Sequence, residues 1–290
     1  MITSHSEYGQ IKSILLKSAT NAFESQEKAD GEWRDLNYLE KIDYDHSKKE
    51  YRTFKEIISA EGAQILNLPK ADTTIDSIYC RDASIATDFG MIICNMGKGA
   101  RSTEPLAQKV FFESKGIPVL GTIESPGTLE GGDMCWLDEK TLAVGLTYRT
   151  NQSGISQLKS LLEPNGIEVL VVDLPHYKGK DDVFHLMSVI SPIDKDLAVI
   201  YSPLMPIGFR EALLNRGFSF VECPAEEFES MGCNVLALAQ RKVLVVSGNP
   251  RTASLLQAKG CEVIVYEGEE ISQKGCGGPT CLTRPINREI

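Results

Sequence analysis

The residue best suited to nucleophilic chemistry is Cys281, which lies at the end of a glycine-rich turn, residues 275–281. Glycine at this density indicates main chain with positive φ, or a ligand that approaches the main chain closely. Pro279 fixes one φ angle shortly before the thiol. A thiol held by such a turn could act as a nucleophile. The alternative is a C-terminal loop that only buries a cysteine.

Five polar residues, the last of them this cysteine, recur along the chain at a nearly constant spacing. They are Asp82, Asp133, His185, Asn234 and Cys281, and successive members lie 51, 52, 49 and 47 residues apart. A steady period near 50 residues indicates a repeat architecture. Each member opens a unit of strand, strand, helix and strand. Kelch blades have a similar period but are all-β, so the helices argue against them.

Four of the predicted units are complete, and in each a glycine follows the helix. Hydrophobic periodicity predicts two adjacent strands, a helix and a closing strand in every unit. The predicted ranges are 84–88, 91–95, helix 104–114 and 117–123; 134–137, 141–146, helix 153–162 and 167–174; 188–191, 197–201, helix 208–214 and 218–223; and 235–239, 242–247, helix 251–258 and 261–266.

The fifth unit is divided between the two ends of the chain. After Cys281 only its first strand remains, and the N-terminal region supplies the missing parts: strand 10–18, helix 47–60 and strand 63–69. The first and last segments should therefore pair and close a ring. This predicts an α/β fold, a five-bladed ββαβ propeller with fivefold pseudosymmetry, forming one domain over residues 1–290. Residues 19–47 look polar and irregular, and so long a connection is often a lid or binding loop.

In such a ring the opening residues of the five units converge on the central axis. Cys281 and His185 together permit nucleophilic catalysis, because histidine can help to form the thiolate and can protonate a leaving group. Two carboxylates, Asp82 and Glu130 beside Asp133, suit a guanidinium group, which offers a planar fork of N–H donors. Thiolate attack on its carbon would give a thiouronium intermediate, and water would release a ureido product. Taken singly, each residue could instead be a turn or capping residue.

Composition agrees with a protein that acts on a small cationic molecule. The 290 residues carry a net charge of −10, which argues against nucleic acid and against an anionic membrane as partner. The sequence shows neither a signal peptide nor a long apolar run, so we expect a cytoplasmic protein with reduced thiols. None of its eight cysteines forms a CxxC pair, and we expect no metal and no cofactor. His5, His46 and His176 are expected at the surface.

Six motifs taken together resemble the guanidino-group-modifying superfamily, the penteins, over nearly the whole chain. This resemblance implies a five-bladed ββαβ propeller, in agreement with the repeat. Within the superfamily the chain is most similar to dimethylarginine dimethylaminohydrolases, with arginine deiminases as near relatives. The motifs are residues 80–82 (Cys-Arg-Asp), 129–133 (Leu-Glu-Gly-Gly-Asp), 145–152, 184–186 (Phe-His-Leu), 232–234 (Gly-Cys-Asn) and 277–281 (Gly-Gly-Pro-Thr-Cys).

The resemblance also implies roles for individual residues. Cys281 would be the nucleophile, His185 the general acid and base, and Glu130 a catalytic carboxylate that also binds the guanidinium. The implied substrate contacts are Asp82 for the guanidinium nitrogens, Arg101 and Arg149 for the substrate carboxylate, Asp76 for the α-amino group, and Arg81 and Asp133 as further binding residues.

Some positions depart from the deiminase pattern and bear on the substrate. Met187 stands where arginine deiminases have an aspartate, and Thr280, directly before the cysteine, resembles dimethylargininases. Residues 277–279 and 81–82 look more like deiminases. We therefore expect a hydrolase that converts Nω-methylated arginine to citrulline and an amine. The alternatives are an arginine deiminase, another ureido or guanidino amino-acid hydrolase, an amidinotransferase, and a non-catalytic propeller that binds a partner. The sequence neither requires nor excludes a homodimer.

Overall fold

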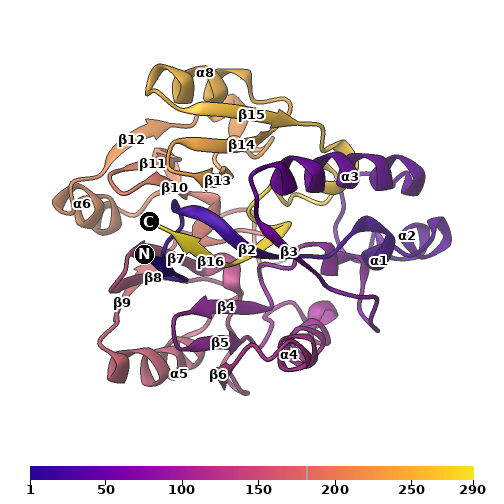
Figure 1. Ribbon diagram of the computed structural model, residues 1–290, viewed down its shortest axis with the longest axis horizontal. Coiled ribbons are helices and arrows are strands. Elements are labelled where there is room, and N and C mark those ends of the chain that lie inside the picture. The colour runs from indigo at the N-terminus through magenta and orange to yellow at the C-terminus, as the bar shows by residue number, and fades with distance from the viewer. Residues whose placement is uncertain (181) are drawn as a thin grey trace.

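The computed structural model describes residues 1–180 and 182–290. Five small sheets make up the centre of the molecule, and the longer helices lie on its outside (Figure 1). These helices are α3 (Tyr44–Ala60), α4 (Glu104–Ser114), α5 (Gln152–Leu162), α6 (Ile207–Asn215) and α8 (Pro250–Ala258). Within the described ranges, no helix combines the length and the hydrophobicity that a membrane span requires.

Four of the sheets share one topology, and each is built from a continuous stretch of chain. The first strand is antiparallel to the second, and the second is parallel to the third. This is the unit predicted from the repeat. The strands are β4 (Ser84–Thr87), β5 (Gly90–Ile93) and β6 (Val119–Thr122); β7 (Met134–Asp138), β8 (Thr141–Leu146) and β9 (Glu168–Asp173); β10 (Ile190–Asp194), β11 (Leu197–Ile200) and β12 (Ser219–Glu222); and β13 (Leu236–Ala239), β14 (Lys242–Val246) and β15 (Glu262–Tyr266).

The fifth sheet joins the two ends of the chain, as predicted. Strand β16 (Thr283–Glu289) runs antiparallel to β2 (Gln10–Leu16), and β2 is parallel to β3 (Gln64–Asn67). A short strand that was not predicted, β1 (Ile2–Thr3), pairs with the free edge of β16. The last strand of the chain therefore lies between two N-terminal strands, and both chain ends are visible side by side in Figure 1.

Helix α3 illustrates how sequence periodicity fixes the outer layer. Tyr51, Phe54 and Ile58 lie three and four residues apart, so they share one face of the helix, and all three are buried. The Phe54 ring lies 5.0 Å from the ring of Tyr266 in β15. Asp43 caps the helix by accepting a hydrogen bond from the main-chain N–H of His46. The helix therefore begins three residues earlier than the predicted range 47–60.

The region 19–47 is more regular than predicted. It contains α1 (Ala19–Ala22) and α2 (Gln26–Glu32), each capped by a serine side chain, Ser18 or Ser25. These helices are too short to show a hydrophobic period, so pattern analysis missed them. The same reason applies to α7 (Ala225–Phe228) and to a π-helical turn, Glu269–Gln273.

Two further predictions from the sequence were wrong in detail. His5 is buried rather than exposed, since its ring stacks on Trp136 at 3.9 Å and its Nδ1 lies 2.9 Å from the carbonyl of Glu139. The first strand of the third unit begins at Ile190 rather than 188, because a 3₁₀ turn, Leu186–Ser188, precedes it. All eight cysteines are free thiols, as expected.

Removal of residues 284–290 should abolish folding and activity together. The deletion takes away nearly all of β16 and leaves β1 and β2 without the strand that lies between them. We expect an insoluble chain, or one without a cooperative thermal transition by circular dichroism. Deletion of Ile290 alone, which lies beyond β16, is the control and should leave the melting curve intact. A soluble and active protein that lacks residues 284–290 would contradict the proposed dependence.

Candidate active site

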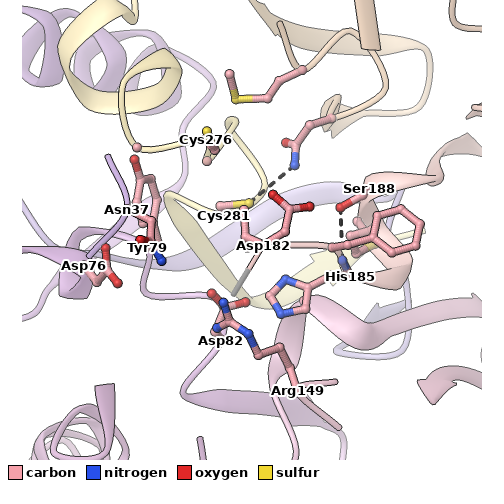
Figure 2. A pocket seen from close by; sticks show the side chains of 18 of the residues that line it. Asn37, Asp76, Tyr79, Asp82, Arg149, Asp182, His185, Ser188, Cys276 and Cys281 are labelled. Carbon is pink, nitrogen blue, oxygen red and sulfur yellow. Dashed lines mark hydrogen bonds between the residues drawn. The ribbon is translucent and has the colours of Figure 1, made fainter. Parts of the chain in front are cut away.

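One pocket is lined by residues from all five units. They precede the first strands of the five sheets: Asp82, Gly132, His185, Asn234 and Cys281. The convergence predicted from the repeat is thus present, except that Gly132 rather than its neighbour Asp133 reaches the lining. Figure 2 shows Cys281 facing Asp82 and His185 across this pocket, with Arg149 beside them.

Glycine is needed near Cys281 because neighbouring side chains leave no room for a Cβ, and not because the main chain has a positive φ. Among residues 275–278 only Cys276 has a positive φ, 56°. A Cβ at Gly278 would lie 2.5 Å from the side-chain amide of Asn234, and one at Gly277 would collide with the ring of Tyr79. Of the two alternatives, positive φ does not apply to these glycines, and the close approach to their main chain comes from the protein's own side chains.

Asn234 holds the Cys281 thiol in position by hydrogen bonding. The Asn234 amide nitrogen donates to Sγ at 3.4 Å, while its oxygen accepts from the Thr280 main-chain and side-chain donors at 3.0 and 2.8 Å. Burial raises the pKa of the Cys281 thiol, and the negative charge of Asp82 raises it further. The hydrogen bonds from Asn234 and Thr280 act in the opposite direction. The resting thiol is therefore protonated at neutral pH, and a cation in the pocket would favour the thiolate.

His185 and Glu130 form a buried pair. Nε2 of His185 lies 2.8 Å from Oε2 of Glu130. Burial by itself lowers the pKa of His185, but the charge of Asp133 and the bond to Glu130 outweigh it and raise the pKa to about 9. Burial likewise raises the pKa of Glu130, yet the hydrogen bond and charge of His185 bring it down to about 2. At neutral pH the pair is therefore an imidazolium and a carboxylate.

Asp133 is a buried residue that stabilises the main chain next to His185. Its two oxygens accept from the main-chain N–H of Leu186 at 3.0 Å and from the Thr147 hydroxyl at 2.8 Å. Burial raises its pKa to about 6, against the lowering effect of His185. Asp133 is fully buried and is absent from the pocket lining, so the predicted contact with substrate does not fit its position. It instead fixes the main chain next to the histidine.

Arg101 is also placed differently from the prediction. Its Nη1 donates to Oδ2 of Asp82 at 2.5 Å, and Nε and Nη2 each donate to Glu104 at 2.8 Å. Arg101 is thus engaged with two buried carboxylates and orients Asp82, rather than presenting a free fork to a substrate carboxylate. The other oxygen of Asp82, Oδ1, is buried and has no partner among the described residues. Since Asp82 lines the pocket, this oxygen is the acceptor that remains for a guanidinium.

Arg81 contributes to the site mainly through its main chain. Its N–H donates to the carbonyl of Cys281 at 3.2 Å, while its guanidinium donates to Glu7 at 2.8 Å. The side chain is 1% exposed. Arg81 also lines the pocket, so its predicted contact with substrate stays a prediction beside its support of the nucleophile's main chain.

The pocket is also lined by Asp76, Arg149 and Lys98. Lys98, which sequence reasoning missed, donates from Nζ to Asp76 at 2.6 Å and to the carbonyl of Leu36 at 2.8 Å. Arg149 lies 3.5 Å from both oxygens of Glu130. Lys98 is only three residues from Arg101, so the motif around Arg101 was the one signal that could have pointed to it. Asp182 also lines the pocket, and no pattern in the sequence indicated it.

Asp82, Glu130 and His185 also bring ligand atoms within 4.8 Å of one another, a spacing that a metal ion could use. However, these three side chains already form hydrogen bonds within the protein, and those bonds compete with metal binding. Histidine binds metals as the neutral imidazole, whereas the charge of Asp133 and the bond to Glu130 keep His185 protonated. One oxygen of Asp82 accepts a hydrogen bond from Arg101, and the other is the acceptor that remains for a ligand. The cluster therefore fits an organic cation better than a metal.

Replacement of Gly132 by alanine should disturb catalysis directly. The added Cβ would lie 2.5 Å from Nδ1 of His185 and 2.7 Å from Oδ1 of Asp82, so both groups must move. A displacement of this size should lower kcat by about 10²-fold. Steady-state kinetics measures the effect, with Gly99→Ala as the control because nothing lies within 4 Å of a Cβ there. Equal activities for the two variants would contradict this geometry.

Known proteins resemble this chain over most of its length. A family model described as "N,N dimethylarginine dimethylhydrolase, eukaryotic" matches residues 17–288. N(G),N(G)-dimethylarginine dimethylaminohydrolase from Streptomyces coelicolor is 29% identical over 245 residues, covering 84% of this chain and 87% of the relative. Arginine deiminase from Mycoplasma capricolum is 26% identical, covering 87% of this chain and 73% of the relative.

A solved structure has the same fold. It is the dimethylarginine dimethylaminohydrolase of Pseudomonas aeruginosa in complex with citrulline, with a TM-score of 0.76 and 23% identity over 94% of this chain and 98% of that one. At this identity the likeness establishes the fold alone. This likeness agrees with the α/β fold of five small sheets that the repeat predicted.

Proposed function

Because this chain belongs to the family of N,N-dimethylarginine dimethylhydrolases, we propose that it hydrolyses Nω-methylated arginine to citrulline and a methylamine. It is a hydrolase of guanidino C–N bonds, and Cys281 is its nucleophile. The observation that carries the proposal is Oδ1 of Asp82, which has no partner among the described residues. Asp82 lines the same pocket as Cys281 and His185. An acceptor, a nucleophile and an acid thus surround one site for a planar cation.

The first half of the reaction forms a bond between Sγ of Cys281 and the guanidinium carbon. Entry of the cationic substrate favours the thiolate, because its positive charge opposes the effects of burial and of Asp82 on the thiol pKa. As the carbon becomes tetrahedral, His185 donates its proton to the departing amine nitrogen. The C–N bond breaks, the methylamine leaves, and a thiouronium remains on Cys281.

The second half releases the ureido product. His185 is now neutral and can accept a proton from a water molecule that attacks the thiouronium carbon. The new C–O bond forms, and the C–S bond breaks as the hydroxyl group of the adduct gives up its remaining proton. The sulfur departs as a thiolate and takes up one proton, which restores the resting thiol. The net change is consumption of one water and release of citrulline and one amine. Glu130 keeps the imidazole oriented and stabilises its charged form in both halves.

Two features favour a methylated guanidinium over arginine itself. Asp82 offers only one oxygen without a protein partner, because Arg101 engages the other. Glu130 likewise accepts from the Lys98 main chain and contacts His185. Few acceptors suit a guanidinium with few N–H donors. Apolar lining from Met187, at the position where deiminases carry an aspartate, would accommodate methyl groups.

The amino-acid end of the substrate would lie toward Asp76, Lys98 and Arg149, which line the same pocket. Arg149 is the better cation for the carboxylate than Arg101, since its contact with Glu130 is long, 3.5 Å, whereas Arg101 is fully engaged. Asp76 would meet the α-ammonium group. This arrangement retains the carboxylate role predicted for Arg149 and assigns Arg101 to holding Asp82.

The substrate and the nucleophile can be tested in one assay. Purified protein is incubated separately with dimethylarginine, monomethylarginine and arginine, and citrulline and amine are quantified. We expect the methylated substrates to be preferred, and Cys281→Ser to lower activity by about 10³-fold or more. Cys276→Ser, in the same turn, is the matched control and should stay active.

Other outcomes of this assay would reassign the function. Preference for arginine would identify a deiminase, and amidino transfer to an added amine would identify a transferase. No product from any substrate, or full activity in Cys281→Ser, would contradict a guanidino hydrolase.

The pH dependence of kcat/KM should reflect the titration of His185 in its pair with Glu130. The pKa of His185 is raised to about 9, so its acid form is present below that pH and is lost above it. We expect kcat/KM to fall as pH rises through about 9. In Glu130→Gln this alkaline limb should move toward pH 6.5, the ordinary value for histidine. A limb that stays in place in the variant would contradict the assigned coupling, and Lys12→Gln at the surface serves as the unshifted control.

A further inference from the structure

Three arginines to which the proposed reaction assigns no step are buried in the interior of the protein. Arg81, Arg284 and Arg288 are 1%, 4% and 1% exposed. Arg284 and Arg288 lie four residues apart on β16, and Arg81 lies directly before the site carboxylate Asp82 and three residues before β4. We refer to these three residues as the arginine cluster. One carboxylate, Glu7, faces it and is itself buried.

The cluster has few acceptors in the protein. Arg81 donates from Nη2 to Oε2 of Glu7 at 2.8 Å, and this is its one carboxylate contact. The remaining contacts go to main-chain carbonyls: Arg284 Nη2 to Arg81 at 2.5 Å, and Arg288 Nη1 to Gly9 at 2.6 Å and Ala237 at 2.8 Å. These partners come from several sheets, so the cluster lies where the sheets meet.

The positive charges of the cluster are close enough to affect one another. Burial, and then the charge of Arg81, lower the pKa of Arg284 to about 10, against the effect of Glu7. Burial also lowers the pKa of Arg288 to about 10, with Arg81 contributing. Values near 10 still leave all three guanidinium groups charged at neutral pH. Three positive charges therefore face a single negative one.

Five guanidinium nitrogens in the cluster also have no acceptor among the described residues. They are Nε and Nη1 of Arg81, Nε of Arg284, and Nε and Nη2 of Arg288. Buried donors normally find a partner, because desolvation without one costs stability. Water could satisfy the hydrogen bonds but would leave the excess positive charge in place. An anion satisfies both requirements.

We propose that the arginine cluster binds one small monovalent inorganic anion, which is chloride in a chloride-containing medium. Close packing favours a single atom over a larger oxyanion: a Cβ at Gly131 would already lie 2.5 Å from Nη2 of Arg284. Arg81 links the cluster to the substrate pocket, because it lines this pocket and donates its main-chain N–H to the carbonyl of Cys281. The bound anion stabilises the main chain that carries the nucleophile.

Bromide provides a direct test, because it replaces chloride and scatters anomalously. Crystals of the full chain are soaked in sodium bromide, and an anomalous difference map is calculated at the bromine edge. We expect a peak within hydrogen-bond distance of guanidinium nitrogens from at least two of the three arginines. A well-ordered cluster that shows only water under these conditions would overturn the proposal.

A solution experiment tests the same site without crystals. The melting temperature is measured while chloride replaces gluconate at constant ionic strength. A specific site should raise Tm by about 2–4 °C between about 10 mM and about 300 mM chloride. An unchanged Tm over this range would count against the site.

Two variants and a control separate this site from a general salt effect. In Arg288→Met, the rise of Tm with chloride concentration should be lost. Glu7→Gln removes the competing carboxylate and should shift the response to about tenfold lower chloride. Lys12→Gln, which breaks an exposed pair with Glu289, should respond like the wild type. An identical response in all four proteins would contradict specific binding. If Arg288→Met or Glu7→Gln does not fold, the bromide map decides.

Discussion

The structure depends on a buried pairing of charges, in which Glu130 holds the proton of His185. Two ionisable groups with almost no exposure coexist because each stabilises the charged form of the other. The surrounding residues complete this arrangement. Asp133 fixes the main chain beside the histidine, and the Lys98 main-chain N–H occupies the second oxygen of Glu130. The acid that the chemistry needs is therefore prepared before substrate arrives.

The fivefold arrangement of sheets explains why these groups meet at all. The two members of the pair precede β7 and β10, and the thiol precedes β16. No local segment of the chain contains more than a part of the site. Each unit delivers one or two groups to the centre, so the position of every group is set by the packing of whole sheets. A glycine such as Gly132 then matters because neighbouring groups from two other units contact its Cα face.

The sequence predicted the fold better than it predicted the roles of long side chains. The repeat located all five sheets, and the limits of α4 and β8 agree with the predicted ranges residue for residue. Main-chain periodicity is a local signal, so it survives without knowledge of neighbours. Which partner an arginine reaches is not a local property. Arg81 and Arg101 were expected to contact substrate, yet each extends to a buried carboxylate contributed by another segment.

The placement of β16 between β1 and β2 has a consequence for synthesis on the ribosome. The strand that completes the N-terminal sheet, together with the cysteine that precedes it, is made after the other four units. The nascent N-terminal strand β2 must therefore keep an unpaired edge until β16 has been made. Four units can form before that moment, but the enzyme gains its nucleophile and its closing strand in the same step. Incomplete translation products would consequently be both unreactive and prone to aggregation.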